Sequence, residues 1–430
     1  RMWFWGGHTL ERVRQIGRNF EKPYSIAETK PNDTAAIVFT TGATGPPKGV
    51  IYEHGMYVAQ VEMLRERFQI GPGDVDLPGF PLFALFSTAL GASAVIPDLD
   101  ASRPGTVDPA KWIEAIRDHG VTYSFGSPTI WSKVTAYCRE RQLTLPTLRL
   151  VLMAGAPVPV WLYERFDGLL TRPDAEVISP YGATESLPTT AIERREVLSD
   201  TGAQTRAGAG YCVGRPLPGV LVRVIALRDD PIPTWDDVEV MPTGAAGEII
   251  FAGRHVTKAY DRNDRANDLA KIRESLPDGS VRIWHRIGDC GRIDEHGRLW
   301  YFGRKAHRVV LDRPGDHLVL YSECCEAIFA EHPDVLRAAL VRVGHGKQAR
   351  PAIVVEPRAG RFPRSRRDRA RLREELEQLG KCNPLTQDIR EFLVHPKFPT
   401  DYRHNAKIIR ERLAEWANRT LRIPPMPPVS

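Results

Sequence analysis

Short apolar runs alternate with amphipathic stretches between residues 35 and 180. Apolar runs bounded by turn-forming residues predict buried strands, here AAIVFT (35–40), SAVIPD (93–98), VTYSFG (121–126), LRLVLMAG (148–155) and AEVISP (175–180). The stretches between them repeat apolar residues at helical spacing and predict helices at 54–68, 109–120, 129–141 and 159–170. This alternation predicts an α/β fold with a largely parallel sheet and helices on its faces.

The pattern changes twice further along the chain. From residue 209 to 303 the segments are short, β-rich and punctuated by glycine, which predicts antiparallel strands in a small barrel or sheet. After Arg304 a helix at 322–333, strands at 335–344 and 350–357, and two further helices predict a compact α+β unit. We therefore expect an α/β core over 1–208, a β-rich subdomain of the same large domain over 209–303, and a small, mobile C-terminal lid domain over 304–430.

Three loops rich in glycine and hydroxyl groups come directly after predicted strands. They are TTGATG (40–45), AGAPV (154–158) and YGATES (181–186). Because parallel strands end at the same edge of a sheet, these loops could line one pocket, where α/β proteins bind their ligands.

The first loop fits a phosphate, although it is not a P-loop. Two prolines without N–H groups precede Lys48, and Gly49 stands where a P-loop carries a hydroxyl. Binding would therefore use threonine side chains, the Lys48 charge and the bending freedom of glycine. A surface turn uses the same residue types, so that alternative stays open. The candidate phosphate-binding residues are Thr40, Thr41, Gly42, Thr44, Gly45 and Lys48.

Composition and charge exclude several classes of protein. No run of 18 apolar residues exists, so we expect no transmembrane helix. The net charge of +6 is concentrated in an arginine-rich stretch at 358–373, but glutamates come after it at helical spacing, which favours a solvated helix over a nucleic-acid surface. The six cysteines form no C-x-x-C pair, which argues against a zinc site or a secreted disulfide framework and favours the cytoplasm.

The order of motifs resembles the adenylate-forming superfamily of acyl-CoA synthetases, luciferases and adenylation domains. The resemblance rests on TTGATGPPKG, AGAPV, YGATE, GEIIFAG, HRIGDCGRID, FGRK and NAKI, in that order over most of the chain. Within the superfamily, residues 74–104 and DYRHNAKI (401–408) are most similar to OleC-type β-lactone synthetases of olefin biosynthesis.

The resemblance implies ATP and Mg²⁺ as cofactors and two catalytic residues. In this superfamily a carboxylate attacks the α-phosphorus of ATP, and pyrophosphate leaves with magnesium. The TTGATGPPKG loop would hold the β- and γ-phosphates, and Glu185 would hold Mg²⁺, because a carboxylate suits a hard cation. Lys407 would bridge the substrate carboxylate and the α-phosphate once the small domain closes. By itself, Glu185 also fits a helix-start carboxylate and Lys407 a solvated side chain.

The nucleoside would be held by the other motifs. The resemblance implies that Tyr181 stacks against adenine and that Asp289 accepts hydrogen bonds from both ribose hydroxyls, although an aspartate here also fits a turn cap. Arg304 would approach the ribose and phosphate. The remaining expected contacts are Gly155, Ala156, Pro157, Gly182, Ala183 and Thr184.

The subfamily resemblance implies a second step after activation. The β-hydroxyl of a long-chain 3-hydroxy acid would attack its own acyl-adenylate carbonyl and expel AMP, giving a β-lactone. Phe80, Phe83 and Phe86 lie three apart and could form a wall for the alkyl chain, or plain helix core. The alternatives are a long-chain acyl-AMP or acyl-CoA ligase and a nucleotide-binding scaffold without turnover. Other enzymes of the same pathway are candidate partners.

Two departures from the family pattern bear on these expectations. Only 40 residues stand before Thr41, fewer than in family members, so we expect that an N-terminal part of the core is absent from this chain. The hinge position after Arg304, usually Asp or Lys in the family, is Ala306, with Lys305 beside it. The consequence for domain rotation stays open.

Overall fold

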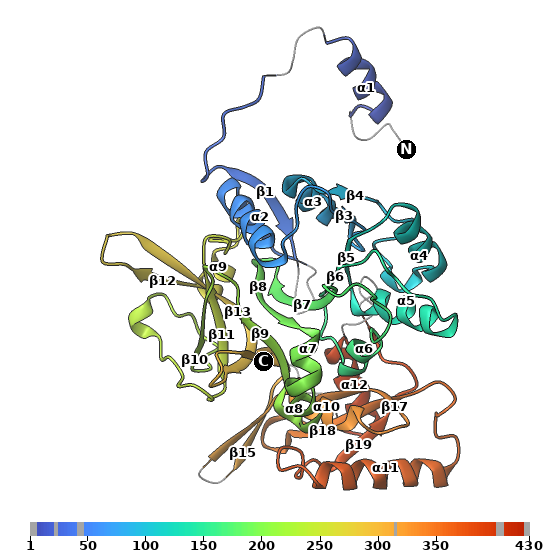
Figure 1. The fold of residues 1–430 in the computed structure, drawn as a ribbon. Coiled ribbons are helices and arrows are strands. Elements are labelled where there is room, and N and C mark those ends of the chain that lie inside the picture. The colour runs from blue at the N-terminus through green and yellow to red at the C-terminus, as the bar shows by residue number, and fades with distance from the viewer. Residues whose placement is uncertain (1–6, 21–24, 41–46, 314–315, 401–407, 425–430) are drawn as a thin grey trace.

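The computed structural model describes residues 7–20, 25–40, 47–313, 316–400 and 408–424. One large mixed sheet lies at its centre, in the strand order β10-β11-β13-β14-β9-β8-β7-β6-β5-β3-β4, with β12 beside β13 (Figure 1). Its parallel strands are β3 (Val75–Asp76), β4 (Ser93–Ala94), β5 (Tyr123–Gly126), β6 (Leu150–Met153) and β7 (Glu176–Ala183). Its antiparallel strands are β8 (Ser186–Glu193), β9 (Tyr211–Pro216), β10 (Leu221–Ile225), β11 (Gly247–Ala252), β12 (Lys271–Ser275), β13 (Val281–Ile293) and β14 (Leu299–Arg304).

Helices cover both faces of the parallel part. They are α2 (His54–Phe68), α3 (Ala84–Leu90), α4 (Pro109–Asp118), α5 (Pro128–Glu140) and α6 (Val160–Glu164). All four residues of β6 are buried, alternately in the hydrophobic cluster that includes α4 and α5 and in the cluster that includes α2. A strand covered on both faces reads as a continuous apolar run, and this is why LVLM is uninterrupted.

Capping residues explain where the predicted helices begin. The side chain of Asp108 accepts a hydrogen bond from the backbone of α4, and that of Ser127 does the same for α5, each with proline at the first helical position. Shorter helical elements complete this part: α1 (Leu10–Arg18), α7 (Arg194–Glu196), α8 (Gly202–Gln204), α9 (Asp264–Ala270), η2 (Pro81–Phe83), η3 (Pro104–Thr106), η4 (Val197–Thr201), η5 (Thr205–Ala209) and η6 (Trp235–Asp237). Helix α1 has no buried residue and stands apart from the sheet in Figure 1.

The prediction for the first strand was wrong about its partner strand and about its burial. β1 (Thr34–Phe39) does not join the parallel sheet; it pairs antiparallel with β2 (Gly49–Glu53) in a separate ribbon, and Phe39 is exposed. Residues 40–48 are too few for the crossover that a parallel partner requires, so the chain turns back on itself. β2 is then joined to the core by Ile51, whose N–H donates to the Ala259 carbonyl at 3.2 Å.

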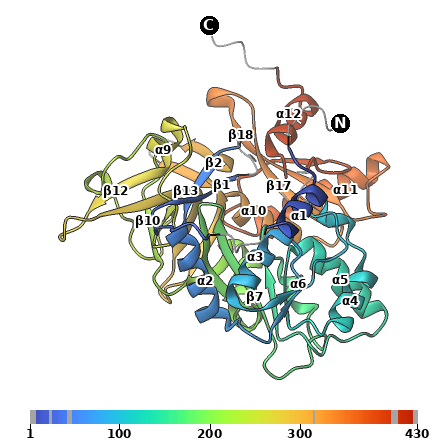
Figure 2. The ribbon, with the colours of Figure 1, turned by 90° about the horizontal axis from the view of Figure 1, so that it is seen from above.

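The β-rich region expected at 209–303 is antiparallel, but it is not a separate sheet. Its strand β9 pairs with β8, which pairs with β7, so the antiparallel strands extend the parallel sheet edge to edge. Figure 2 shows strands β10, β12 and β13 on one side of the molecule and helices α4, α5 and α6 on the other. A turn at 295–297 joins β13 to β14, with Gly297 at φ +72°.

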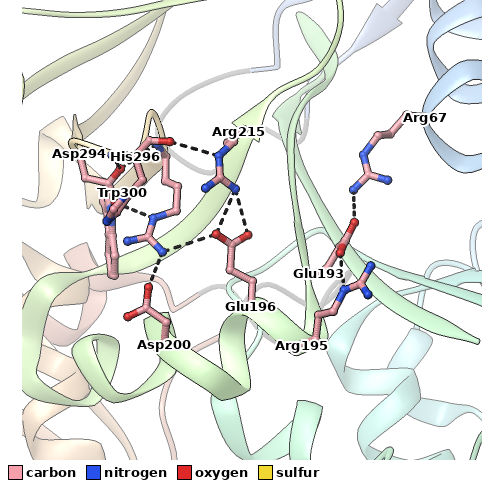
Figure 3. Close-up of polar contacts among 10 residues, drawn as sticks. Arg67, Glu193, Arg195, Glu196, Asp200, Arg215, Asp294, His296 and Trp300 are labelled. Carbon is pink, nitrogen blue, oxygen red and sulfur yellow. Dashed lines mark hydrogen bonds and ion pairs between the residues drawn. The ribbon is translucent and has the colours of Figure 1, made fainter.

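Ion pairs stabilise the junction of the two parts of the sheet (Figure 3). The largely buried Arg298 donates to Asp294 at 2.7 Å and to Asp200 at 2.5 Å. Arg215 contacts Glu196 at 3.0 Å, while Arg67 contacts Glu193 at 2.9 Å. Because each of these arginines is paired with a carboxylate of the protein itself, we interpret these ion pairs as structural contacts rather than as a binding site.

After Arg304 the chain forms a small sheet with helices packed on it. Its elements are η7 (Lys305–His307), β15 (Val309–Arg313), β16 (Asp316–Leu320), α10 (Ser322–Ala330), β17 (Val335–Val343), η8 (Gly346–Gln348), β18 (Arg350–Pro357), α11 (Arg366–Lys381), β19 (Glu391–Val394) and α12 (Arg410–Thr420). Hydrophobic clusters pack on the sheet β17-β18-β19, one including residues of α10 and α11 and the other including residues of α12. No described helix of the chain is long and apolar enough to cross a membrane.

Candidate active site

The YGATE segment forms a tight turn at the centre of the large sheet. Strand β7 runs on through Ala183, and β8 begins at Ser186, so Thr184 and Glu185 form the turn. A Cβ atom on Gly182 would lie 2.3 Å from the Ser186 carbonyl oxygen, so only glycine fits there. The carbonyl of Thr184 accepts a hydrogen bond from the Tyr52 hydroxyl of β2.

Glu185 is held in a buried and specific environment. The residue is 8 % exposed, and its Oε1 accepts a hydrogen bond from the Tyr260 hydroxyl at 2.6 Å. Its backbone carbonyl accepts from the Thr257 N–H at 2.9 Å. Burial, with the Glu185 charge adding to it, raises the pKa of Tyr260, so this hydroxyl stays protonated and donates.

The two described ends of the first loop meet at the same place. The N–H of Lys48 donates to Thr40 Oγ1 at 3.1 Å, and Lys48 Nζ lies 5.0 Å from the centre of the Tyr260 ring. Tyr260 therefore contacts both the lysine of the TTGATGPPKG loop and the carboxylate of YGATE. The predicted phosphate-binding residues Thr41, Gly42, Thr44 and Gly45 lie outside the described residues.

Three further predicted residues form one polar cluster. The Tyr181 hydroxyl donates to Asp289 Oδ2 at 2.6 Å, and Arg304 Nη1 lies 3.1 Å from Asp289 Oδ1. Asp289 and Arg304 are partners across the β13–β14 ladder, which fixes their approach. Burial raises the pKa of Tyr181 well above its usual range, so the phenol remains a donor. The prediction gave these residues separate nucleotide contacts; in the structure they also bond to each other.

The AGAPV loop lies at the carboxyl edge of the parallel strands. It comes after β6, whose neighbour β7 carries Tyr181, and the Ser179 hydroxyl donates to the Met153 carbonyl at 2.9 Å. Gly155 has φ +95°, a backbone conformation that other residues rarely adopt. Gly155 and Pro157 are exposed and Ala156 is half-buried, so the backbone of this loop is accessible to a ligand.

The predicted aromatic stripe is neither fully buried nor isolated. Phe80 is exposed, and Phe83 and Phe86 are half-buried, with ring centres 5.5 Å (Phe80–Phe83) and 6.0 Å (Phe83–Phe86) apart. The row continues from Phe86 to Tyr57 at 6.2 Å and from Tyr57 to Tyr52 at 4.7 Å. It therefore leads from the molecular surface to the tyrosine that bonds the YGATE turn.

Sequence reasoning did not single out Lys271, which lies beside Tyr260, the hydrogen-bond partner of Glu185. Lys271 is buried, its pKa is lowered to about 7 by that burial, and its ammonium donates to the Thr257 carbonyl. His285, its partner across the β12–β13 ladder, is buried with Nδ1 3.2 Å from the Ala270 carbonyl, and burial lowers its pKa well below the usual range. No motif singles out Lys271, and a lone lysine in sequence is normally a surface side chain.

The residues present fit a metal ion that is bound mainly by a ligand's phosphates. Among the described residues no group of three or more acidic, histidine or cysteine side chains could hold a metal ion alone. Glu185 is a single carboxylate with one oxygen bonded to Tyr260. One carboxylate together with phosphate oxygens is a usual environment for Mg²⁺.

The structure leaves the second predicted catalytic residue untested. Lys407 lies outside the described residues. Ile408, the next residue, forms an isolated bridge with Thr400, and Arg410 at the start of α12 pairs with the buried Glu326 of α10. Two cavities lie elsewhere on the described surface. One, of about 600 Å³, lies beside α11, and the other, of about 230 Å³, lies beside the ion pairs of Arg67 and Arg215. Neither cavity is lined by a predicted site residue.

Comparison with known proteins gives both a family and close relatives. The profile of the family described as AMP-binding enzyme matches residues 8–261. The chain is 46 % identical over 413 residues to an olefin β-lactone synthetase of Xanthomonas campestris pv. campestris, covering 96 % of this chain and 72 % of the relative. It is 43 % identical over 417 residues to an olefin β-lactone synthetase of Stenotrophomonas maltophilia, covering 97 % and 72 %.

Solved structures share the fold at low sequence identity. ATP-bound MatB from Rhodopseudomonas palustris aligns with a TM-score of 0.72 and 21 % identity, over 95 % of this chain and 73 % of that one. O-succinylbenzoate coenzyme A synthetase from Bacillus subtilis, in complex with ATP and a magnesium ion, aligns with a TM-score of 0.69 and 21 % identity, over 93 % and 74 %. The chain therefore belongs to the family of AMP-binding, adenylate-forming enzymes, and its similar relatives include olefin β-lactone synthetases.

Proposed function

We propose that this protein uses ATP to convert a long-chain 3-hydroxy acid into a β-lactone, with AMP and pyrophosphate as the other products. The observation that carries the proposal is the meeting of Lys48 and Glu185 on Tyr260, with Tyr181 of the same strand–turn unit bonded to Asp289. These contacts bring three groups into one region: the Lys48 cation, the Glu185 carboxylate, and the Asp289 carboxylate, which could accept hydrogen bonds from a ribose. The similarity to olefin β-lactone synthetases selects the acid and the product.

The first step joins the acid to the nucleotide. A substrate carboxylate oxygen forms a bond to the α-phosphorus, the bond to the bridging oxygen breaks, and pyrophosphate leaves. Lys48 and the predicted residues of the 40–45 loop would offset the negative charge of the β- and γ-phosphates. When bound through Glu185, Mg²⁺ would neutralise phosphate charge and help pyrophosphate to leave.

The nucleoside would bind along the carboxyl edge of β6 and β7. Tyr181 would lie against the adenine, and the exposed backbone of Gly155, Ala156 and Pro157 would flank it. A carboxylate oxygen can accept more than one hydrogen bond, so ribose hydroxyls could bind to Asp289 while Tyr181 and Arg304 remain in place. The turn residues Gly182, Ala183 and Thr184 would shape the space between base and phosphates.

The second step closes the four-membered ring. The β-hydroxyl oxygen of the bound acyl-adenylate forms a bond to the acyl carbon, AMP leaves with the electron pair of the broken anhydride bond, and the hydroxyl proton passes to solvent or a base. No second substrate is needed, because nucleophile and electrophile belong to one bound chain. Lys407 would serve the first step by contacting the carboxylate and the α-phosphate; this role stays a prediction.

The aromatic row supports an apolar acid. Phe80, Phe83 and Phe86, continued by Tyr57, run from the surface towards the YGATE turn. An alkyl chain lying along these rings would be removed from water while its carboxylate reaches the region of Glu185. We also propose a cytoplasmic location, because all six cysteines are free and five are buried, as in a reducing compartment. We further propose assembly with other enzymes of the same pathway.

Two measurements on the purified protein test the proposal. We expect ATP–pyrophosphate exchange that requires a long-chain 3-hydroxy acid and Mg²⁺, and a β-lactone detected by mass spectrometry without coenzyme A. A Lys407→Ala variant should lose exchange, whereas Lys397→Ala, a lysine that precedes the same segment and has no proposed role, should retain it.

Other outcomes identify the alternatives. An acyl-CoA that forms only when coenzyme A is added, with no lactone in its absence, would replace lactone formation by an acyl-CoA ligase activity. Nucleotide binding with no exchange for any hydroxy acid would leave a scaffold without turnover.

A further inference from the structure

Lys271 is a buried lysine. Among the described residues no carboxylate lies within ion-pair distance of its ammonium, and the Glu185 charge acts on it only from further away. It is the first residue of β12 and comes immediately after helix α9. The residue is 8 % exposed, and its ammonium donates to the Thr257 carbonyl and lies 3.4 Å from Thr257 Oγ1. Removing an ammonium from water is costly unless other groups compensate it, so the position calls for an explanation.

Part of the compensation comes from an aromatic ring that is itself part of the candidate site. Lys271 Nζ lies 5.4 Å from the centre of the Tyr260 ring, and Lys48 Nζ lies 5.0 Å from the same centre. Tyr260 is 4 % exposed, so both contacts are largely shielded from water. A cation near an aromatic ring at this distance is attracted by the ring's electrons, more strongly when water is excluded.

Tyr260 passes this arrangement on to Glu185. Its hydroxyl donates to Glu185 Oε1 at 2.6 Å, and its N–H donates to the Asn267 side chain at 2.7 Å. The backbone of Tyr260 is thus held by Asn267 of α9, and its ring lies beside the Lys271 ammonium. The Tyr260 hydroxyl in turn holds one carboxylate oxygen of Glu185. With Oε1 engaged, Glu185 offers Oε2 to a cation in one defined orientation.

We propose that Lys271 is a positioning residue of the metal–triphosphate site, which acts through Tyr260 to orient the Glu185 carboxylate. The inference rests on the proposed function, because Glu185 is taken as the carboxylate that meets the metal. Lys271 itself need not touch the nucleotide: its ammonium is bonded to Thr257, and Tyr260 is the residue that both Lys271 and Glu185 contact.

The first test replaces the ammonium by a neutral group of similar length. In Lys271→Met we expect the Mg²⁺ concentration for half-maximal pyrophosphate exchange to rise roughly 10- to 30-fold, as loss of a desolvated cation–π contact implies. The KM for the hydroxy acid should change much less, because the alkyl chain is proposed to lie along the aromatic row and the path from Lys271 through Tyr260 acts on the carboxylate that meets the metal. MgATP should also raise the melting temperature less in the variant than in the wild type, a readout independent of turnover.

A matched control separates positioning from a general loss of positive charge. Lys258→Met removes an ammonium from the neighbouring segment, where Lys258 pairs with Glu53 at 2.7 Å and is half exposed. It should leave the Mg²⁺ dependence unchanged. An equal shift in Lys258→Met and Lys271→Met would overturn the inference.

A double-mutant cycle tests the path through the ring. Tyr260→Phe keeps the ring and removes only the hydroxyl, so it should shift the Mg²⁺ dependence as Lys271→Met does. Because the two residues act in series, the double variant should be no worse than the more affected single variant. Fully multiplied effects would show that Lys271 acts elsewhere and would overturn the inference.

The outcomes also separate this inference from the proposed function. If the wild-type protein shows neither pyrophosphate exchange nor stabilisation by MgATP, both the proposed function and the role of Lys271 are contradicted. If the wild type is active and Lys271→Met has a normal Mg²⁺ dependence, only the role of Lys271 is contradicted. If Lys271→Met fails to fold, Lys271→Arg should keep near-normal Mg²⁺ dependence and Tyr260→Phe should still shift it; a wild-type dependence in Tyr260→Phe would then overturn the inference.

Discussion

At the scale of single residues, the site depends on groups that hold one another before any ligand arrives. Asp289 accepts from Tyr181 and pairs with Arg304, and its side chain is only 5 % exposed. Glu185 is fixed by Tyr260 in the same manner. Preorganised polar groups of this kind lower the cost of ordering a site when its ligand binds.

Replacing Asp289 by asparagine should therefore affect stability as well as the proposed binding of a nucleotide. The amide cannot accept at both ends, so its NH₂ group would face either Arg304 or the Tyr181 hydroxyl. We expect a loss of roughly 2 kcal/mol in the free energy of unfolding, the size of a hydrogen bond to a charged group. Urea unfolding measures this change.

The control is an aspartate–arginine pair at the surface. Asp174 pairs with Arg172 at 2.8 Å, and both side chains are well exposed. Asp174→Asn should leave unfolding unchanged within error, because exposed ion pairs contribute little. Equal losses in the two variants would contradict the burial argument for Asp289.

At the scale of elements, strand β3 and the residue before it contain two aspartates, Asp76 and Asp74, whose pKa values are shifted in opposite directions. Asp76 is 2 % exposed and accepts from the Ser87 hydroxyl of α3 at 2.7 Å, and burial raises its pKa to about 7. For Asp74 burial alone would raise the pKa, but hydrogen bonds from Arg149 and Thr122 outweigh it and the pKa is lowered. The Asp76–Ser87 contact links α3, and with it the aromatic row, to the parallel sheet.

The two aspartates predict opposite pH dependences of stability. The folded state holds the Asp76 proton up to about pH 7, whereas the unfolded chain loses it near pH 3.8, so stability falls as pH rises through this window. Asp76→Asn should thus be more stable than wild type at pH 8, by on the order of 2–4 kcal/mol, and lose that advantage at pH 4. Urea unfolding at the two pH values measures the difference.

Asp74→Asn serves as the matched variant two residues away. The lowered pKa of Asp74 means that its stabilising charge is present above its unfolded pKa and is lost as pH falls through the folded value. This variant should therefore be less stable than wild type at pH 8. A gain in stability for both variants at pH 8 would contradict the assigned directions.

At the scale of the whole molecule, the segment after Arg304 joins the large sheet to the C-terminal unit through buried charges. Lys305 Nζ donates to Glu248 Oε2 at 2.9 Å and to the Arg228 carbonyl at 2.7 Å. Glu248 is 1 % exposed and also pairs with Arg286 at 2.7 Å. Lys305 therefore has an anchoring contact beside Ala306, the position expected to act as the hinge.

Removing this anchor should loosen the connection between the two units. In Lys305→Met, Glu248 keeps Arg286 but loses its contact with the connecting segment, so the segment should open more often. We expect chymotrypsin to cut between the units several times faster than in the wild type. Arg228→Met, which breaks an exposed pair with Asp230, should be cut at the wild-type rate; equal rates in wild type and Lys305→Met would contradict the anchoring role.

Much of the architecture could be predicted because local chemistry encodes it. Helix α2 occupies the predicted residues 54–68, and α4 and α5 begin where Asp108 and Ser127 provide caps. Strands β5, β6, β17 and β18 arise from apolar runs that stay buried on both faces or on one. Periodicity fixes such elements because an amphipathic or apolar segment has few other ways to bury its side chains.

By itself, the sequence determined many of the helices and strands and the family, and it singled out the motif residues Lys48, Glu185, Tyr181, Asp289 and Arg304, because each of these is encoded within a few neighbouring positions. Only the tertiary structure decided that β1 pairs with β2 and that Tyr260 and Lys271 stand beside Glu185. Strand partners and buried charges depend on contacts between segments far apart in the chain, about which local periodicity carries no information.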